Sequence, residues 1–187
     1  MVLRDRAQFD LAVRLREGRA SLGDVFAFIS GLYFRGKLAY SQVFAAPPSG
    51  VPGSLVITAG GGLVPPDTPV SLDQLRAIAS VPIDAADPRY REPLERDARL
   101  LEAAIGPECV VVLLGSIATA KYLTPLLAIF GERLLFPEAF VGRGDMSRGG
   151  LMLRAARSVE ELAYTPVSGA ILHGPRPPKL PKIPRGG

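Results

Sequence analysis

The sequence is poor in the residues that form disulfides, metal centres and histidine-dependent active sites. Its 187 residues include one cysteine, Cys109, one histidine, His173, and no tryptophan. A single cysteine excludes an internal disulfide. One cysteine with one histidine argues against a dedicated zinc site and against a catalytic cysteine–histidine or serine–histidine pair. We therefore predict no metal site and a surface position for the histidine, and any chemistry has to rest on acidic, basic, tyrosine and serine side chains.

Targeting signals and standard nucleotide-binding signatures are missing as well. No apolar run reaches the roughly 18 residues of a membrane span, and the N-terminus shows no charged-then-apolar secretory signal. We therefore expect a soluble, cytoplasmic protein with no membrane partner. The chain contains no G-x-x-x-x-G-K-[ST] phosphate loop, and no G-x-G-x-x-G pattern follows either early predicted strand. The sequence therefore names no cofactor and leaves open whether the protein is an enzyme.

The excess positive charge belongs to the C-terminus. The net charge is +4. Residues 171–187 carry four cations and no acid, so residues 1–170 are formally neutral (4 − 4 = 0), and the high isoelectric point is no evidence for a basic domain face. Repeated prolines in this tail favour an extended polyproline geometry. Two interpretations stay open: a solubilising tail, or a peptide that docks on a partner or on an anionic surface such as RNA.

The segment from Glu108 to Arg148 carries the clearest fold signal. Residues 109–114 form a short, valine-rich apolar run typical of a buried strand, and Gly115-Ser116 ends it. Residues 119–131 have apolar side chains at helical spacing, and residues 134–136 form a second short strand. A strand, a helix and a strand in this order predict a parallel pair with a right-handed crossover.

The remaining patterns complete an α/β prediction. We expect a small, largely parallel sheet with flanking helices, an N-terminal helical pair, a C-terminal β-hairpin and a Pro-rich tail. The assignment is 1–46 for N-terminal helices packed on the core, 54–170 for an α/β domain and 171–187 for the tail. Besides the elements above, we expect helices at 5–17, behind a capping Ser21, at 72–80 and at 93–105, and strands at 54–58 and 81–83. The hairpin would pair 151–155 with 162–167, and a helix beginning at Ser147 is the alternative.

The helix behind Ser21 contains two glycines and two cations of interest. Gly31 and Gly36 interrupt its apolar face and predict a bend or close packing at these points. Arg35 and Lys37 follow in its C-terminal half. We interpret these cations as favourable charge at a helix end, with contact to a ligand as the alternative.

Three glycine-rich loops each follow a predicted strand: 59–62, 115–116 and 142–150. If the strands are parallel, all three loops open at the carboxyl edge of the sheet, where open α/β sheets bind ligands. Their backbone N–H groups would then cradle an anion. The candidate ligand-binding residues are Gly60, Gly61, Gly62, Gly115, Ser116, Lys121, Arg143, Ser147 and Arg148. Asp145 is the candidate acid or base, although pairing with its neighbouring arginines is its more ordinary role.

Three stretches carry a family resemblance. The first stretch, Leu55–Asp67, begins with a predicted strand and continues through small residues into the pattern Gly-Leu-x-Pro-x-Asp. The second, Val110–Tyr122, begins with an apolar strand and leads through a glycine and a Lys-Tyr pair into a helix. The third is the Leu-Tyr start at Leu32-Tyr33. Together they resemble the bacterial peroxide-stress protein family and the uracil-DNA-glycosylase-like domains attached to relatives of tRNA-modifying transglycosylases. The resemblance implies an α/β fold with a nucleic-acid leaning.

The resemblance departs from true uracil-DNA glycosylases at the positions that matter for activity. Those enzymes share an acidic, water-activating loop and a late histidine motif. Here the first loop begins Ala59-Gly60-Gly61, and His173 is followed by glycine and proline. The resemblance therefore assigns no glycosylase activity to a named residue.

Three functions are compatible with these patterns. The first is binding or processing of a nucleotide or nucleic acid through an anion-binding carboxyl edge of the sheet. The second is a small-molecule enzyme acting on a phosphorylated or carboxylated substrate, with Asp145 as acid or base. The third is a non-catalytic interaction module whose tail docks on a partner. We favour the first.

Overall fold

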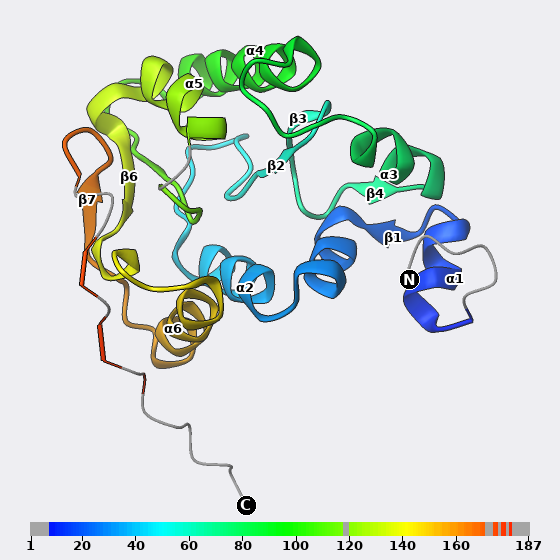
Figure 1. The fold of residues 1–187 in the computed structure, drawn as a ribbon, viewed down its shortest axis with the longest axis horizontal. Coiled ribbons are helices and arrows are strands. Elements are labelled where there is room, and N and C mark those ends of the chain that lie inside the picture. Colours follow the sequence, from blue (N-terminus) through cyan, green and yellow to red (C-terminus); the bar gives the residue numbers. More distant parts are fainter. Residues whose placement is uncertain (1–7, 118–119, 171–173, 176, 179, 181–187) are drawn as a thin grey trace, which may run out of the picture.

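The computed structural model describes residues 8–117 and 120–170, together with Gly174, Pro175, Pro177, Pro178 and Leu180 of the tail. Within these ranges the chain is a mixed α/β structure built around two groups of elements (Figure 1). His173 and the first seven residues lie outside the described residues.

Helices and short strands follow one another along the chain. The helices are α1 (Asp10–Arg16), α2 (Leu22–Phe44), α3 (Leu72–Ala79), α4 (Pro88–Ile105), α5 (Ala120–Phe130) and α6 (Asp145–Ser158), with 3-10 turns η1 (Gly131–Arg133) and η2 (Glu138–Phe140). The strands are β1 (Ala20–Ser21), β2 (Val56–Thr58), β3 (Gly62–Val64), β4 (Pro69–Val70), β5 (Val111–Val112), β6 (Leu134–Pro137) and β7 (Tyr164–Pro166). The prediction of a broadly α/β chain is confirmed.

The strands form three small sheets instead of one. In the sheet β5-β6-β7, β5 pairs parallel with β6, so the parallel pair expected from the sequence is confirmed, and β7 pairs antiparallel with β6. The pairs β2–β3 and β1–β4 are both antiparallel. The expectation of a largely parallel sheet is therefore wrong for the described residues. β2 and β3 follow each other closely through a glycine turn, and such a connection can only join antiparallel neighbours.

The predicted C-terminal hairpin is wrong in its first half. Residues 151–155 belong to α6, so the alternative of a helix was the correct one. The alternation of Leu151, Leu153 and Ala155 was misleading, because Met152 and Ala155, three residues apart, are the buried side chains that face the core. The second half does form a strand, β7, which pairs with β6.

Two smaller expectations also need correction. Residues 81–83 form no strand. The helix expected at 93–105 already begins at Pro88, because the Asp87 side chain accepts a hydrogen bond from Arg89 N and a proline suits the first helical position. By contrast, Ser71 caps α3 through a full capping box with Gln74.

The hydrophobic interior has two parts. The smaller cluster is formed by Leu11, Leu15, Ala20, Leu22, Val25, Val56, Val70 and Leu75. The larger cluster is built from α4, α5, α6, the sheet β5-β6-β7 and the second half of α2, which contributes Tyr40. In Figure 1 the elements α1, β1, β4 and α3 gather at one end, and α2 runs from them into the larger group.

Helix α2 connects these parts through a kink and a close contact. Gly31 (φ 59°, ψ −134°) breaks the helical geometry, so the first and second halves of α2 point in different directions. One turn later, an added Cβ at Gly36 would lie 2.6 Å from the Gly149 carbonyl oxygen of α6. The predicted bend and close packing are both confirmed, and together they place the second half of α2 directly against α6.

Candidate functional site

The glycine turn at 59–62 lies away from the other two predicted loops. It joins β2 to β3, where Thr58 Oγ1 donates to the Gly62 carbonyl oxygen at 3.1 Å. Asp97 of α4 accepts a hydrogen bond from Leu63 N at 2.9 Å, and its carboxylate fills the space beside Gly62. These glycines therefore face α4 and a carboxylate. The expectation that all three loops share one edge is wrong, because β2 belongs to an antiparallel hairpin outside the sheet β5-β6-β7.

The turn at Gly115-Ser116 follows β5 and is enclosed by two tyrosines. Tyr122 of α5 donates a hydrogen bond to the Ser116 carbonyl oxygen at 2.7 Å. Tyr33 of α2 donates to the Leu114 carbonyl oxygen at 3.4 Å. Lys121 is exposed on α5. The tyrosine of α2 therefore connects the end of β5 to the surface between α2 and α6.

The predicted residues 143–148 lie at the start of α6 and hold one another in place. Arg143 Nε donates to the Ala139 carbonyl oxygen at 2.9 Å, and its Nη1 lies 3.3 Å from Ser147 Oγ. Arg148 Nε donates to the Phe140 carbonyl oxygen at 3.2 Å, and its Nη1 lies 3.5 Å from Asp145. The pairing of Asp145 with a neighbouring arginine is therefore what the structure shows.

Lys37 joins this group from α2. It lies in the middle of the helix, so the interpretation of its charge as helix-end charge is wrong. Its amine lies 4.1 Å above the ring of Tyr33, and within the described part of the chain no hydrogen bond or ion pair reaches it. Burial lowers the pKa of Lys37 to about 8; Asp145 opposes this shift and Arg148 adds to it. A lysine whose pKa is lowered by burial, in a group that contains a second cation, is a candidate functional residue.

Tyr33 links the two cations to the end of β5. Burial raises the pKa of its hydroxyl to about 12, while interaction with Arg148 opposes the rise. The hydroxyl therefore stays protonated across the physiological range. Its proton is donated to the Leu114 carbonyl oxygen, which holds the ring that lies beneath the Lys37 amine.

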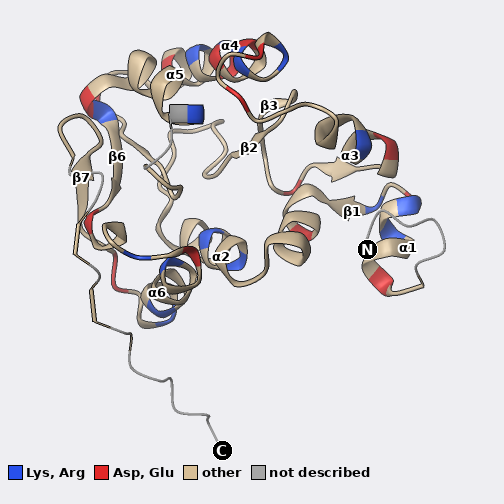
Figure 2. Ribbon diagram, viewed as in Figure 1, with Lys and Arg blue, Asp and Glu red and all other residues tan. Residues whose placement is uncertain are grey.

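We call the group Tyr33, Lys37, Asp145 and Arg148 the α2–α6 cluster. The Arg148 side chain is only 11% exposed, whereas that of Asp145 is 64% exposed. Two partly buried cations are thus offset by one carboxylate that is mostly in water, where its charge is screened. In Figure 2 the basic segments of α2 and α6 lie on neighbouring helices. The cluster has the charge and hydrogen-bonding groups to hold an anion.

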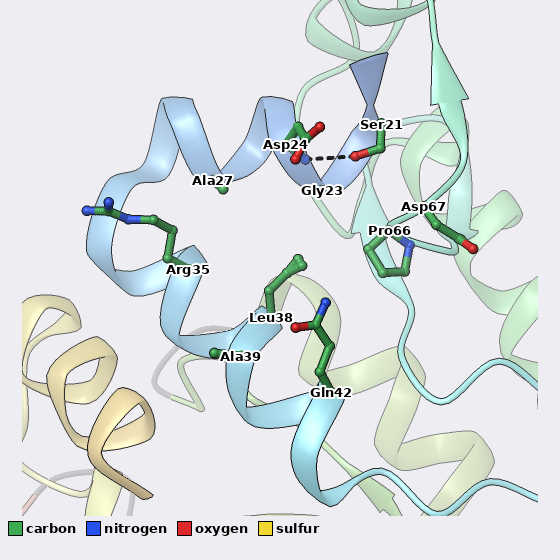
Figure 3. Close-up of a pocket in the computed structure, with 10 residues that line it drawn as sticks. All are labelled: Ser21, Gly23, Asp24, Ala27, Arg35, Leu38, Ala39, Gln42, Pro66 and Asp67. Carbon is green, nitrogen blue, oxygen red and sulfur yellow. Dashed lines mark hydrogen bonds between the residues drawn. The ribbon is translucent and has the colours of Figure 1, made fainter. Parts of the chain in front are cut away.

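A pocket of about 370 Å³ lies on the other face of α2 (Figure 3). Helical spacing puts Arg35, Leu38, Ala39 and Gln42 on this face, opposite Lys37. The first half of α2 and the turn at Pro66-Asp67 close the pocket. Figure 3 shows the guanidinium of Arg35 pointing away from Leu38 and Gln42.

No known relative guides the interpretation. Comparisons with family models, with curated proteins and with solved structures found no match to this chain. In the described ranges, no three or more histidine, cysteine, aspartate or glutamate side chains gather as a metal site would require. Nor does any described helix combine the length and apolarity needed to cross a bilayer. The candidate site therefore rests on its geometry alone.

The sequence predicted the α6 residues of the cluster as candidate site residues, but it did not predict the α2 residues as such. Arg143, Asp145, Ser147 and Arg148 were predicted, whereas Lys37 was assigned to a helix end and Tyr33 appeared only in the family resemblance. The available signal was the spacing of Tyr33, Gly36 and Lys37 at i, i+3 and i+4, which puts a small residue and two functional groups on one helix face.

Proposed function

We propose that the protein binds a nucleotide, or a nucleotide unit of a nucleic acid, through a phosphate group held by the α2–α6 cluster. The observation that carries the proposal is the partly buried pair of cations, Lys37 and Arg148, with the mostly exposed Asp145 as their neighbouring carboxylate. A bound phosphate would supply the missing negative charge. It would also raise the pKa of Lys37 towards its ordinary value, because an opposite charge favours the protonated amine.

The surroundings of the cluster support an oxyanion. An arginine guanidinium can hold a phosphate through two parallel hydrogen bonds. Helix α6 begins at Asp145 without a side-chain cap, so the N–H groups of its first turn are available to a ligand. The end of β5 is tied to the cluster through the hydrogen bond from Tyr33 to the Leu114 carbonyl oxygen.

Calorimetric titration with inorganic phosphate, a nucleoside monophosphate and a nucleoside triphosphate tests the proposal. Arg148→Gln should weaken binding about tenfold or more, since a hydrogen bond to a charged group contributes about 1.5–3 kcal/mol. Arg157→Gln is the matched control, because it removes an exposed arginine from the other end of α6. Equal affinities for both variants, or no binding by the wild-type protein, would refute the proposal.

The tail needs a separate test for nucleic acid. Residues 1–170 are formally neutral and the tail carries the excess charge. Binding of a single-stranded oligonucleotide should therefore be measured at two salt concentrations, with and without residues 174–187. If deletion of the tail abolishes binding, the affinity came from general electrostatic attraction between the tail and the oligonucleotide. Affinity that survives the deletion and falls in Arg148→Gln supports recognition by the cluster.

A second candidate is a small-molecule enzyme, favoured by the lowered pKa of Lys37. Such an amine can serve as a base or nucleophile near neutral pH. The role of acid or base first considered for Asp145 passes to Lys37, because Asp145 is mostly exposed and pairs with Arg148.

The alternative of a non-catalytic interaction module stays a prediction, as does the cytoplasmic location. Arg143 Nη1 lies 3.4 Å from the Pro178 carbonyl oxygen, so part of the tail contacts its own chain.

A further inference from the structure

We propose that Lys37 condenses with the carbonyl group of a phosphorylated aldehyde or ketone whose phosphate is held by Arg148. The inference rests on the proposed function, because it uses the same phosphate site. It narrows the ligand to compounds that carry a reactive carbonyl close to the phosphate, a class that includes open-chain sugar phosphates.

The backbone contact between α2 and α6 fixes the two residues relative to each other. Added Cβ atoms at Gly36 and Gly149 would lie 2.6 Å and 2.7 Å from carbonyl oxygens of the opposite helix. Lys37 directly follows the first glycine and Arg148 directly precedes the second. Two helices in backbone contact leave little freedom for the separation of these side chains.

The environment of Lys37 favours the neutral, nucleophilic amine. Burial of the side chain disfavours the ammonium ion and outweighs the attraction of the Tyr33 ring face, 4.1 Å from the amine, for the charged form. With a pKa of about 8, roughly one molecule in ten carries a neutral amine at pH 7, against fewer than about one in a thousand for an unperturbed lysine. Arg148 keeps its charge under these conditions, so one residue can hold the anion while the other reacts.

The reaction is balanced without a cofactor. Lys37 Nζ attacks the carbonyl carbon, the C–N bond forms as the C=O π bond breaks, and the proton that the nitrogen loses goes to the oxygen to give a neutral carbinolamine. A second proton, from solvent, lets the hydroxyl leave as water while the nitrogen lone pair forms the C=N bond, which gives a protonated imine. The Tyr33 hydroxyl donates its proton to the Leu114 carbonyl oxygen, so the protons that the reacting oxygen takes up come from the amine and from solvent.

Reductive trapping with matched probes tests the inference. The intact protein is incubated at pH 7 with glycolaldehyde phosphate or with glycolaldehyde, reduced with cyanoborohydride, digested and mapped by mass spectrometry. With the phosphorylated probe, Lys37 should be labelled about tenfold or more faster than the exposed Lys121, and labelling should saturate. Lys37→Arg should abolish this fast component.

The role of Arg148 is tested in the same assay. Arg148→Gln should slow labelling of Lys37 by glycolaldehyde phosphate about tenfold more than it slows labelling by glycolaldehyde, since only the first probe carries a group for the guanidinium. Loss of the nearby positive charge also raises the pKa of Lys37, and this effect slows both probes equally. If this variant is unstable, competition by inorganic phosphate in the wild-type protein replaces it and should slow the phosphorylated probe.

The outcomes separate this inference from the proposed function. Equal labelling rates for Lys37 and Lys121 would overturn the inference. So would a labelling rate of Lys37 that is the same for both probes and is unchanged by the loss of Arg148. If phosphate still binds in the calorimeter, the binding function stands and only the covalent step is lost. Absence of phosphate binding together with absence of trapping would remove both.

Discussion

Gly36 of α2 and Gly149 of α6 touch through their backbones: an added Cβ at Gly36 would lie 2.6 Å from the Gly149 carbonyl oxygen. Two helices approach this closely only where neither carries a side chain at the crossing. The contact fixes the two helices that carry Lys37 and Arg148, and the charge of Arg148 is near enough to help lower the pKa of Lys37.

Gly149→Ala should therefore destabilise the protein by about 1–3 kcal/mol, because the new methyl group would meet backbone atoms of Leu32 and Tyr33 that cannot move aside. Gly150→Ala is the matched control in the same helix. Among the described residues its Cβ would meet Leu180 alone, at 3.7 Å, so the gain in helix propensity should stabilise the protein by up to about 1 kcal/mol. Urea unfolding measures both. Equal effects of the two substitutions would mean that the helices are not in close contact.

Gly31→Ala should cost about 1–3 kcal/mol through backbone strain alone. Its conformation (φ 59°, ψ −134°) is one that side chains avoid, and no atom of the described residues lies within 4 Å of an added Cβ. Gly144→Ala is the control: it also adds a Cβ to open space, but its φ of −79° is ordinary. If Gly31→Ala were as harmless as Gly144→Ala, α2 would not be kinked at this residue.

The stability of the protein should depend on pH through Lys37. Its pKa is lowered from an ordinary lysine value to about 8 in the folded chain. Between pH 8 and about 10 the unfolded chain therefore holds more protons, and the free energy of unfolding rises with pH. Below pH 8 the folded protein carries the full cost of the buried charge.

Lys37→Met isolates this contribution. The variant should be more stable than the wild-type protein at pH 7 by about 1–3 kcal/mol, and the difference should shrink as the pH approaches 10. Urea unfolding in phosphate-free buffer across this range is the measurement. A difference that stays constant with pH would show that Lys37 titrates normally.

Two tyrosines link α2 to β7, and their hydroxyl groups should contribute unequally. The hydroxyl oxygens of Tyr40 and Tyr164 lie 2.5 Å apart, and Tyr40 also accepts a hydrogen bond from Leu162 N at 2.9 Å. Tyr164 donates to Glu161, so Tyr40 donates to Tyr164. Tyr40→Phe leaves a backbone N–H without its acceptor and should cost about 1–3 kcal/mol, whereas Tyr164→Phe should cost less. Unfolding of the two single variants and the double variant tests this ranking; a larger cost for Tyr164→Phe would contradict it.

The turn at 59–62 should prove structural. Asp97→Ala removes the acceptor for Leu63 N and should destabilise the protein by about 1–2 kcal/mol, while Asp97→Asn, which keeps an acceptor oxygen, should cost less. Phosphate affinity, measured where both variants are folded, should be unchanged. If the Asp97→Ala protein is folded but no longer binds phosphate, the glycines of the turn at 59–62 would have to be counted as part of the phosphate site.

Local patterns were sufficient where neighbours along the chain decide the structure. The strand–helix–strand segment ending at β6, the Ser71 cap of α3 and the bend at Gly31 all follow from residues close by in the sequence. Patterns failed where the same spacing suits two structures. The alternating Leu151 and Leu153 predicted a strand because the burial of Met152 against distant elements is invisible in the sequence.

The amino-acid sequence alone determined the helices α1 to α5, the parallel pair β5–β6, the position of the bend in α2 and the arginines 143 and 148, but it favoured a hairpin where α6 lies. These depend on hydrophobic spacing, on capping residues and on the conformations open to glycine, all of which act over a few residues. Only the tertiary structure separated the 59–62 turn from the other loops and set Lys37 of α2 beside Arg148 of α6. Helical spacing shows which side chains share a face, whereas the partner of that face, and therefore the burial and the pKa of a lysine on it, is decided by how whole helices pack.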